Sequence, residues 1–352
     1  MLIALVSFLV VIAVLVLAHE LGHFVTARAA GVKVLEFGLG FPPRLFGIRR
    51  GETVYSLNVI PLGGFVKLAG EEDPGVTGSL ASKSVGVRLM VLGAGSFMNL
   101  ILPILLFSVA FMVPHNEVVG LVTIEEVAPG SPAARAGIRP GDTILRANGN
   151  TINHAGDLQR YLQLNLGSEV TLDIKHMDGV AESVRVVPRW RPPPGQGATG
   201  VAIRTVDAKV ISESGPFWRA VPIGVRTSIE TFVLFKNGIV SMIIGAVPAQ
   251  VTGPVGIAQI TGEVARAGIG PLLEFAAFLS INLGIINILP LPALDGGRIA
   301  FVILEWVRRG RRIQPKTEAL IHLIGFVTLI ALILLVTYRD IVRIISGESL
   351  IP

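Results

Sequence analysis

The sequence predicts a polytopic α-helical membrane protein with about four transmembrane helices, membrane-associated β-hairpins and one inserted soluble α+β domain. Three observations support this fold class. Hydrophobic residues make up 51% of the chain and the mean hydropathy is +0.67, while only 16% of residues are charged, against roughly 25% in soluble domains. Long apolar runs alternate with stretches that are rich in Lys and Arg. A segment of balanced charge separates the second apolar run from the third.

The charge and cysteine content exclude several function classes. The net charge of +5 and the pI of about 9.8 could indicate nucleic-acid binding, but the basic residues form no basic and aromatic patch. They lie beside apolar segments, as in the cytoplasmic loops of membrane proteins, so no nucleic-acid partner is predicted. The absence of cysteine excludes disulfides and thiolate ligands, so any metal must be held by nitrogen and oxygen.

The first third of the chain predicts two spans around a β region. Residues 1–30 form the first transmembrane helix; a cleavable signal peptide is the alternative, but no positively charged segment precedes the apolar run. Residues 31–87 alternate short apolar runs with Gly and Pro, which predicts a re-entrant β region, and their many basic residues place it on the cytoplasmic side. Residues 88–113 form the second transmembrane helix.

The rest of the chain begins with a soluble domain at residues 115–190, where acidic and basic residues balance. A linker with an amphipathic membrane-surface helix follows at residues 191–270, and a third span at 271–297. The chain then continues with a basic cytoplasmic loop (298–318), a fourth span (319–340) and a C-terminal tail (341–352). The distribution of Lys and Arg then places both termini and the soluble domain outside the cytoplasm.

An HExxH motif at residues 19–23 ends the first apolar run. On a helix, His19 and His23 lie on one face and can bind the same metal ion. Glu20 is rotated by about 100° from His19 and is a candidate general base toward a metal-activated water. A chance match on a packed helix is the alternative, but ionisable side chains in a membrane segment are usually functional. The motif therefore predicts a zinc site and hydrolysis.

A catalytic zinc site usually takes a third protein ligand. Asp295 is the only acid in an apolar stretch that Pro290 and Pro292 interrupt, and the two glycines that follow let the backbone turn there. We therefore predict that Asp295 is the third ligand. The alternatives are a helix-capping role for Asp295, or ligation by an acid that flanks the stretch: Glu263, Glu274 or Glu305.

Asn282 and Asn287 lie in the same stretch. Their amides could hold a substrate carbonyl or stabilise an oxyanion, or could instead form hydrogen bonds between helices, and their spacing does not decide between these roles. None of the other histidines is assigned to the metal: His115, His154, His176 and His322.

Five sequence motifs together resemble the site-2 protease family, in particular the bacterial regulator-of-sigma-factor proteases. They are HELGH, GLGF with PLGGFVKL, GAGSFMN, GLVTIEEVAPGSPAARAGIRPGDTILRANG and NILPLPALDGGR, and they occur in the expected order over nearly the whole chain. The resemblance implies an intramembrane zinc endopeptidase of the bacterial cytoplasmic membrane with one zinc ion. It would cleave single-span membrane proteins such as anti-sigma factors and remnant signal peptides.

The resemblance also implies roles for individual residues. His19, His23 and Asp295 match the zinc ligands and Glu20 matches the catalytic Glu, while Asn287 and Asn282 match asparagines that hold substrate. The hairpin region resembles an element that presents an extended substrate strand, and its glycines are candidate substrate-binding residues: Gly38, Gly40, Gly63 and Gly64.

Residues 115–190 resemble a circularly permuted PDZ domain, outside the cytoplasm. Such domains bind a peptide or protein ligand by strand addition, and Gly120 and Leu121 are the expected carboxylate loop. Two features depart from the family pattern: a single PDZ domain where relatives often carry a tandem pair, and Ser96 where many relatives have Pro. The first departure leaves the substrate open.

Two other function classes fit parts of the sequence. A non-catalytic PDZ-bearing membrane scaffold would not need an intact Glu20 between two ligands. A transporter is also consistent with broken helices that contain acids, but no internal repeat is evident. Two His and one carboxylate could also hold iron, although the Glu next to His19 favours hydrolysis and zinc.

Overall fold

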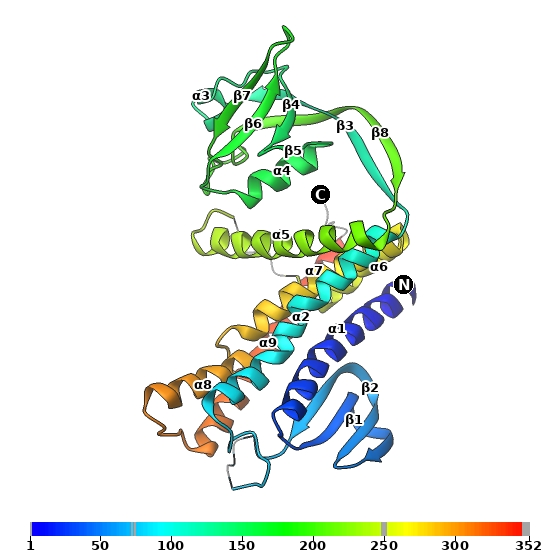
Figure 1. Ribbon diagram of the computed structural model, residues 1–352, viewed down its shortest axis with the longest axis vertical. Coiled ribbons are helices and arrows are strands. Elements are labelled where there is room, and N and C mark those ends of the chain that lie inside the picture. The colour runs from blue at the N-terminus through cyan, green and yellow to red at the C-terminus, as the bar shows by residue number, and fades with distance from the viewer. Residues whose placement is uncertain (1, 72, 74, 248–251, 347–352) are drawn as a thin grey trace. The chain divides into compact units, whose positions relative to one another are not determined.

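The computed structural model describes residues 2–71, 73, 75–247 and 252–346 (Figure 1). The chain divides into two compact units. The first consists of Met1–Ala110, Phe217–Ser228 and Val251–Pro352, and the second of Phe111–Pro216 and Ile229–Gln250. The part of the expected C-terminal tail beyond residue 346 lies outside the described residues.

Long apolar helices form most of the first unit. Four of the described helices are long and apolar enough to cross a membrane: α1 (Leu2–Ala29), α2 (Val85–Met112), α7 (Ile269–Ile288) and α9 (Pro315–Ser346). At about 1.5 Å per residue even the shortest, α7, reaches roughly 30 Å, the thickness of a hydrocarbon core. The expected number of apolar spans is therefore confirmed by length and composition.

The third predicted span and the basic loop after it differ from expectation. α7 ends at Ile288, and a separate helix, α8 (Asp295–Val307), begins at the aspartate. Pro290 and Pro292 lie between the two helices, and because proline cannot donate a helical hydrogen bond, the chain turns there. α8 thus occupies much of the range expected to be loop. Another helix, α6 (Pro254–Ala267), packs against α1 with Gly262 directly on Ala4.

Two long antiparallel strands, β1 (Val34–Arg50) and β2 (Thr53–Leu68), form the predicted hairpin region. Both strands bend, so that the segment from Glu36 to Leu39 pairs with 54–57 on one edge and with 64–67 on the other. Gly40 lies at a bend with a φ of 78°, where its missing Cβ would meet the Ile60 carbonyl oxygen at 2.5 Å. The base of the hairpin joins a buried apolar cluster with α1, α2 and α8.

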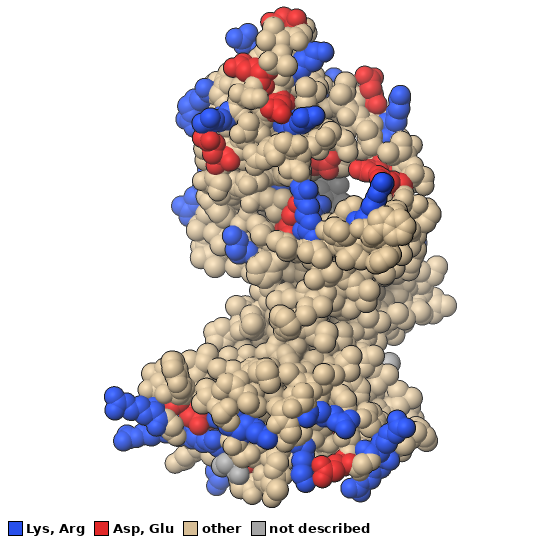
Figure 2. Space-filling model, in the orientation of Figure 1, with Lys and Arg blue, Asp and Glu red and all other residues tan. Residues whose placement is uncertain are grey.

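On the face shown in Figure 2, Lys and Arg side chains gather at the end of the first unit that carries β1, β2 and α8, and the neighbouring helical surface is almost uncharged. Many of them form ion pairs, for example Arg88 with Glu305 at 2.6 Å and Lys33 with Glu52 at 3.0 Å. Basic residues at one end of a helical bundle are typical of the cytoplasmic side of a membrane protein.

The second unit is built on an antiparallel sheet with the strand order β7-β6-β4-β3-β8, and β5 pairs with β4. Its strands are β3 (His115–Val127), β4 (Thr143–Ala147), β5 (Asn150–Thr151), β6 (Val170–Lys175), β7 (Ala181–Val186) and β8 (Val201–Glu213). Its apolar core lies between this sheet and two helices, α3 (Pro132–Arg135) and α4 (Ala155–Leu164).

The region expected to be a linker after residue 190 contains strand β8, which pairs with β3 from Val201↔Val127 to Glu213↔His115. The alternation of apolar and polar residues in VAIRTVDAKV is a strand pattern, so this part of the sequence was assigned wrongly. The amphipathic helix expected after it is α5 (Phe217–Ile243). Its Asn237 donates to the Gln163 carbonyl oxygen at 2.8 Å, within the second unit.

Candidate metal centre

α1 places His19 and His23 on one face of the helix, one turn apart, and both are buried. Their Nε2 atoms lie 3.2 Å from each other. The Nδ1 atom of His23 lies 2.8 Å from the Val91 carbonyl oxygen on α2. Nδ1 of His19 lies 3.2 Å from the side-chain amide of Asn99, also on α2. The two rings are therefore turned so that their Nε2 atoms point to the same place.

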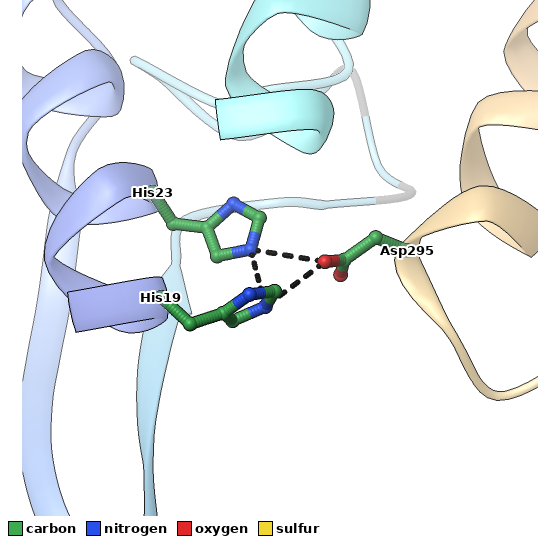
Figure 3. Close-up of side chains that lie close together, drawn as sticks. All are labelled: His19, His23 and Asp295. Carbon is green, nitrogen blue, oxygen red and sulfur yellow. Dashed lines mark hydrogen bonds and ion pairs between the residues drawn. The ribbon is translucent and has the colours of Figure 1, made fainter. Parts of the chain in front are cut away.

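Asp295 reaches this place from the first residue of α8 (Figure 3). Its Oδ2 atom lies 3.0 Å from Nε2 of His19 and 3.2 Å from Nε2 of His23. The preceding turn contains Ala293 with a φ of 74°, a strained conformation for a residue with a Cβ. The backbone N–H of Ala293 donates to Nδ1 of His322 on α9 at 2.9 Å, which holds the turn in place.

The two glycines after Asp295 have a steric role. A Cβ on Gly296 would lie 2.0 Å from the Leu289 carbonyl oxygen, and one on Gly297 would lie 2.4 Å from that of Leu291. Only glycine lets the first turn of α8 pack so closely on the end of α7. The LDGG sequence therefore positions the carboxylate as well as supplying it.

These three side chains suit a zinc ion by number, chemistry and spacing. Two imidazole nitrogens and one carboxylate oxygen form a donor set used by catalytic zinc sites, which leave a fourth position open. With zinc–ligand bonds of about 2.0–2.2 Å, tetrahedral geometry places neighbouring donors roughly 3.3 Å apart or slightly more. The distances of 3.0 to 3.2 Å between the donor atoms come close to this. Within the described residues no other group of three such side chains converges.

A cavity of about 560 Å³ opens beside this centre, and Glu20, His23 and Asp295 are among its lining residues. The Val66 backbone donates a hydrogen bond to the Glu20 carboxylate, so β2 contacts the candidate base directly. Gly64 lies beside this carboxylate: a Cβ there would meet Cγ of Glu20 at an ordinary contact distance of 3.4 Å and would lie 2.9 Å from the Gly38 carbonyl oxygen. The aromatic residues Phe41 and Phe65 complete an apolar wall. The site thus combines a metal-binding set, a carboxylate and a cavity that can admit a chain.

Gly95 and Asn99 on α2 belong to the site but were not assigned to it from the sequence. A Cβ on Gly95 would lie 2.3 Å from Nε2 of His23 and 2.7 Å from Nε2 of His19. Asn99 is fully buried in an apolar helix. Their separation of one helical turn, with a buried amide in a membrane span, is the signal that could have identified them.

The expected substrate-binding residues are not part of the group of metal-binding side chains. Asn282 and Asn287 lie on α7 and are half-buried, and neither lines the cavity. Of the four glycines, Gly64 touches Glu20, and Gly63 lies near Phe41, which lines the cavity. Gly38 packs on the Phe65 ring. Their roles toward substrate remain predictions.

Gly120 and Leu121 lie inside strand β3 rather than in a loop. The N–H of Gly120 already donates to the Asn153 carbonyl oxygen at 2.7 Å, and Leu121 pairs with Val206 of β8. Because the Gly120 amide is occupied, it is not open to an incoming carboxylate. Both residues nevertheless line a cavity of about 640 Å³ in the second unit, so their role toward the end of a peptide stays a prediction.

The flanking acids considered as alternative ligands have other partners. Glu305 accepts from Arg88 at 2.6 Å and from Arg312 at 3.0 Å. Burial acts to raise the pKa of Glu305, but the two guanidinium groups hold this pKa below its ordinary value. Glu263 accepts from Gln259 at 3.0 Å. Glu274 is not part of the converging group. Asp295 is therefore the acid that meets the two histidines.

Comparison with known proteins shows that the chain is similar to zinc metalloproteases over nearly its whole length. The model of peptidase family M50 matches residues 7–332. A protein of Clostridium acetobutylicum, provisionally named a zinc metalloprotease, is 36% identical over 337 residues, 94% of each chain. Zinc metalloprotease RasP of Geobacillus kaustophilus is 30% identical in an alignment that is 426 residues long and covers 96% of this chain and 97% of that protein. The regulator of sigma-W protease RasP of Bacillus subtilis is 28% identical in an alignment that is 432 residues long and covers 96% of this chain and 98% of that protein.

Proposed function

Because the chain belongs to peptidase family M50, the site-2 proteases, we propose that His19, His23 and Asp295 hold its catalytic zinc ion and that Glu20 is the general base. The protein is a multi-pass membrane zinc metalloprotease of regulated proteolysis. The observation that supports the assignment is the convergence of three donor atoms next to a cavity that Glu20 also lines. One zinc ion accounts for this donor set.

The reaction is hydrolysis of a peptide bond. When bound, zinc would polarise the scissile carbonyl and lower the pKa of a water molecule. Glu20 takes the proton of the attacking water and passes it to the amine that leaves. The N–H of Val66 holds the Glu20 carboxylate toward the cavity. Asn99 and the Val91 carbonyl orient the imidazoles from behind.

The substrate must present an extended chain, because the hydrogen bonds of a helix hide its peptide groups. We propose that the bent hairpin of β1 and β2 receives an unwound substrate segment by strand addition. Two observations support this role. Val66 of the hairpin contacts Glu20, and Phe41, Phe65 and Val66 line the cavity. Gly38, Gly40, Gly63 and Gly64 keep the hairpin narrow, and Asn282 and Asn287 on α7 hold the substrate chain.

We further propose single-span membrane proteins, such as anti-sigma factors and remnant signal peptides, as substrates, in the cytoplasmic membrane of a bacterium. The Bacillus subtilis relative is named as a regulator of sigma-W. The second unit is proposed to be a PDZ domain outside the cytoplasm. β7 and β8 are the two edge strands of the described sheet, and the ligand would add to β8, the edge strand that α4 contacts. The N-terminal end of α4 contacts this strand through Ala155 and Thr205, at 2.9 Å.

Cleavage of a tagged single-span model substrate in reconstituted membranes tests the proposal. Wild type should cut, Glu20→Gln should retain zinc but lose most activity, and His23→Ala should lose both. General acid–base groups typically contribute about 10²–10⁴-fold to the rate, which sets the expected loss for Glu20→Gln. If the wild type and Glu20→Gln both bind zinc and neither cuts any of several substrates, a non-catalytic scaffold becomes the better explanation.

A further inference from the structure

Both imidazoles of the proposed zinc site have their outward nitrogen against the same helix. On α2, Val91 faces Nδ1 of His23 at 2.8 Å and Asn99 faces Nδ1 of His19 at 3.2 Å. Gly95 lies between them in sequence, and its missing Cβ lets α2 lie directly on the rings. α2 is therefore the part of the chain that decides how both rings are turned.

The Val91 contact fixes one tautomer. A backbone carbonyl can only accept a hydrogen bond, so Nδ1 of His23 must carry the proton and donate it. The lone pair of Nε2 is then free for a metal ion. The direction of this hydrogen bond thus makes His23 a ligand through the nitrogen that points at Asp295.

Asn99 can act on His19 in two ways, because an amide has a donating and an accepting end. If Nδ2 donates to Nδ1, the ring proton must lie on Nε2, where it blocks metal binding. If Oδ1 accepts from Nδ1, the lone pair of Nε2 is free. Nδ2 faces the ring, and within the described residues the buried Oδ1 atom has no hydrogen-bond partner. A half-turn of the amide gives Oδ1 a donor and gives His19 the tautomer that zinc requires.

We propose that Asn99 is a positioning residue of the zinc site: its Oδ1 accepts the Nδ1 proton of His19 and so sets both the tautomer and the orientation of this ligand. Partners of this kind typically contribute about 10–100-fold to metal affinity. Asn99 suits the role because it is fully buried and its backbone is fixed. Ser280 on α7 donates to the Asn99 carbonyl oxygen at 2.8 Å. The inference rests on the proposed ligation by His19.

The test uses the full-length protein in detergent, with zinc affinity from chelator competition and the visible spectrum of the Co²⁺-substituted protein as readouts. Asn99→Leu keeps the size of the side chain but removes the acceptor, so zinc affinity should fall by about 10–100-fold and the Co²⁺ spectrum should change. Asn99→Asp keeps an acceptor and has no donor, so its affinity should stay within a few-fold of wild type. Ser108→Ala is the matched control for a buried polar change on α2, because its hydroxyl donates to the Ile104 carbonyl oxygen of the same helix, and it should leave both readouts unchanged.

The outcomes separate this inference from the function it rests on. Wild-type affinity in Asn99→Leu overturns the positioning role, and so does an equal loss in Asn99→Asp, because an essential donor would then be indicated. A loss in Ser108→Ala that matches Asn99→Leu would also overturn it, since a general disturbance of α2 would then explain the effect. If Asn99→Leu does not fold, the zinc affinity and the Co²⁺ spectrum of Asn99→Asp decide. Values close to wild type support the role of Oδ1, and a large loss overturns it. His19→Ala is measured alongside: if it binds zinc like wild type, the ligand assignment itself fails.

Discussion

Two clusters in this protein bring histidine next to carboxylate, and they differ in where the nitrogens point. In the first unit, His19, His23 and Asp295 lie with their donor atoms 3.0 to 3.2 Å apart. In the second unit, His176 lies between Asp142, at 2.8 Å from Nδ1, and Glu182, at 3.2 Å from Nε2. The distances are similar, so the difference lies in the arrangement.

In the first cluster both Nδ1 atoms contact α2, and the Nε2 atoms converge with the carboxylate on one point. In the second cluster each nitrogen of His176 faces a different carboxylate, which suits a protonated ring that links strand β7 to the turn before β4. Asp142 also accepts from the Arg139 N–H at 2.7 Å and is buried. Convergence of lone pairs, more than the presence of histidine and acid, therefore distinguishes a metal site from a structural ion pair.

The convergence should be broken most completely by Gly95→Ala. The new Cβ would lie 2.3 to 2.7 Å from ring atoms of His23 and His19, so both rings must move. We expect zinc affinity to fall by more than about 100-fold, beyond the usual loss when a partner that only orients a ligand is removed. Chelator competition on metal-free protein measures this. Gly93→Ala is the matched control, since its Cβ would meet only Ile299, at 4.0 Å. Unchanged affinity in Gly95→Ala would contradict the packing described here.

Gly296→Ala should break the convergence from the side of the carboxylate. Its Cβ would lie 2.0 Å from the Leu289 carbonyl oxygen, so the start of α8 must move away and take Asp295 with it. We expect a loss of about tenfold or more in zinc affinity, smaller than for Gly95→Ala because a turn adapts more easily than two packed helices. The same titration applies, again with Gly93→Ala as control. An affinity equal to wild type would show that the turn does not set the position of Asp295.

The sequence allowed the local parts of this site to be predicted, but not the contacts across the fold. HELGH places two ligands on one helix, and the prolines and glycines around Asp295 mark a turn. The contacts of Asn99 and Val91 with the rings depend on how α2 packs on α1, and no spacing within the chain encodes that packing. For strand β8 the alternation in VAIRTVDAKV is a local signal, whereas its pairing with β3, at residues 115–127 and about eighty residues earlier, is a contact across the fold that the sequence does not encode.

His322→Ala should weaken zinc binding less than the two glycine substitutions, because it affects only one contact of the turn before Asp295. It removes the acceptor of the Ala293 N–H, and Ala293 has a strained φ of 74°. We expect zinc affinity to fall only a few-fold, below about tenfold, because the glycines and prolines still shape the turn. Thr328→Ala on the same helix is the control, since its hydroxyl bonds only within α9, to the Ile324 carbonyl oxygen. An equal effect of both substitutions would point to a general disturbance of α9.

The smallest effect belongs to the second cluster, where removing the histidine should change stability and leave metal binding intact. Hydrogen bonds to Asp142 and then to Glu182 raise the pKa of His176 above its ordinary value. A pKa that is higher in the folded state means that the charged ring stabilises the fold fully below the unfolded pKa, and that this contribution disappears as the pH rises through the folded pKa. His176→Gln should therefore lower the melting temperature of the full-length protein more at about pH 6 than at about pH 9. Zinc affinity should equal that of wild type, since His176 belongs to the second unit. A difference in melting temperature that stays constant over this pH range would mean that His176 acts through packing alone. The two clusters would then differ in the direction of their nitrogens but not in the charge of the ring.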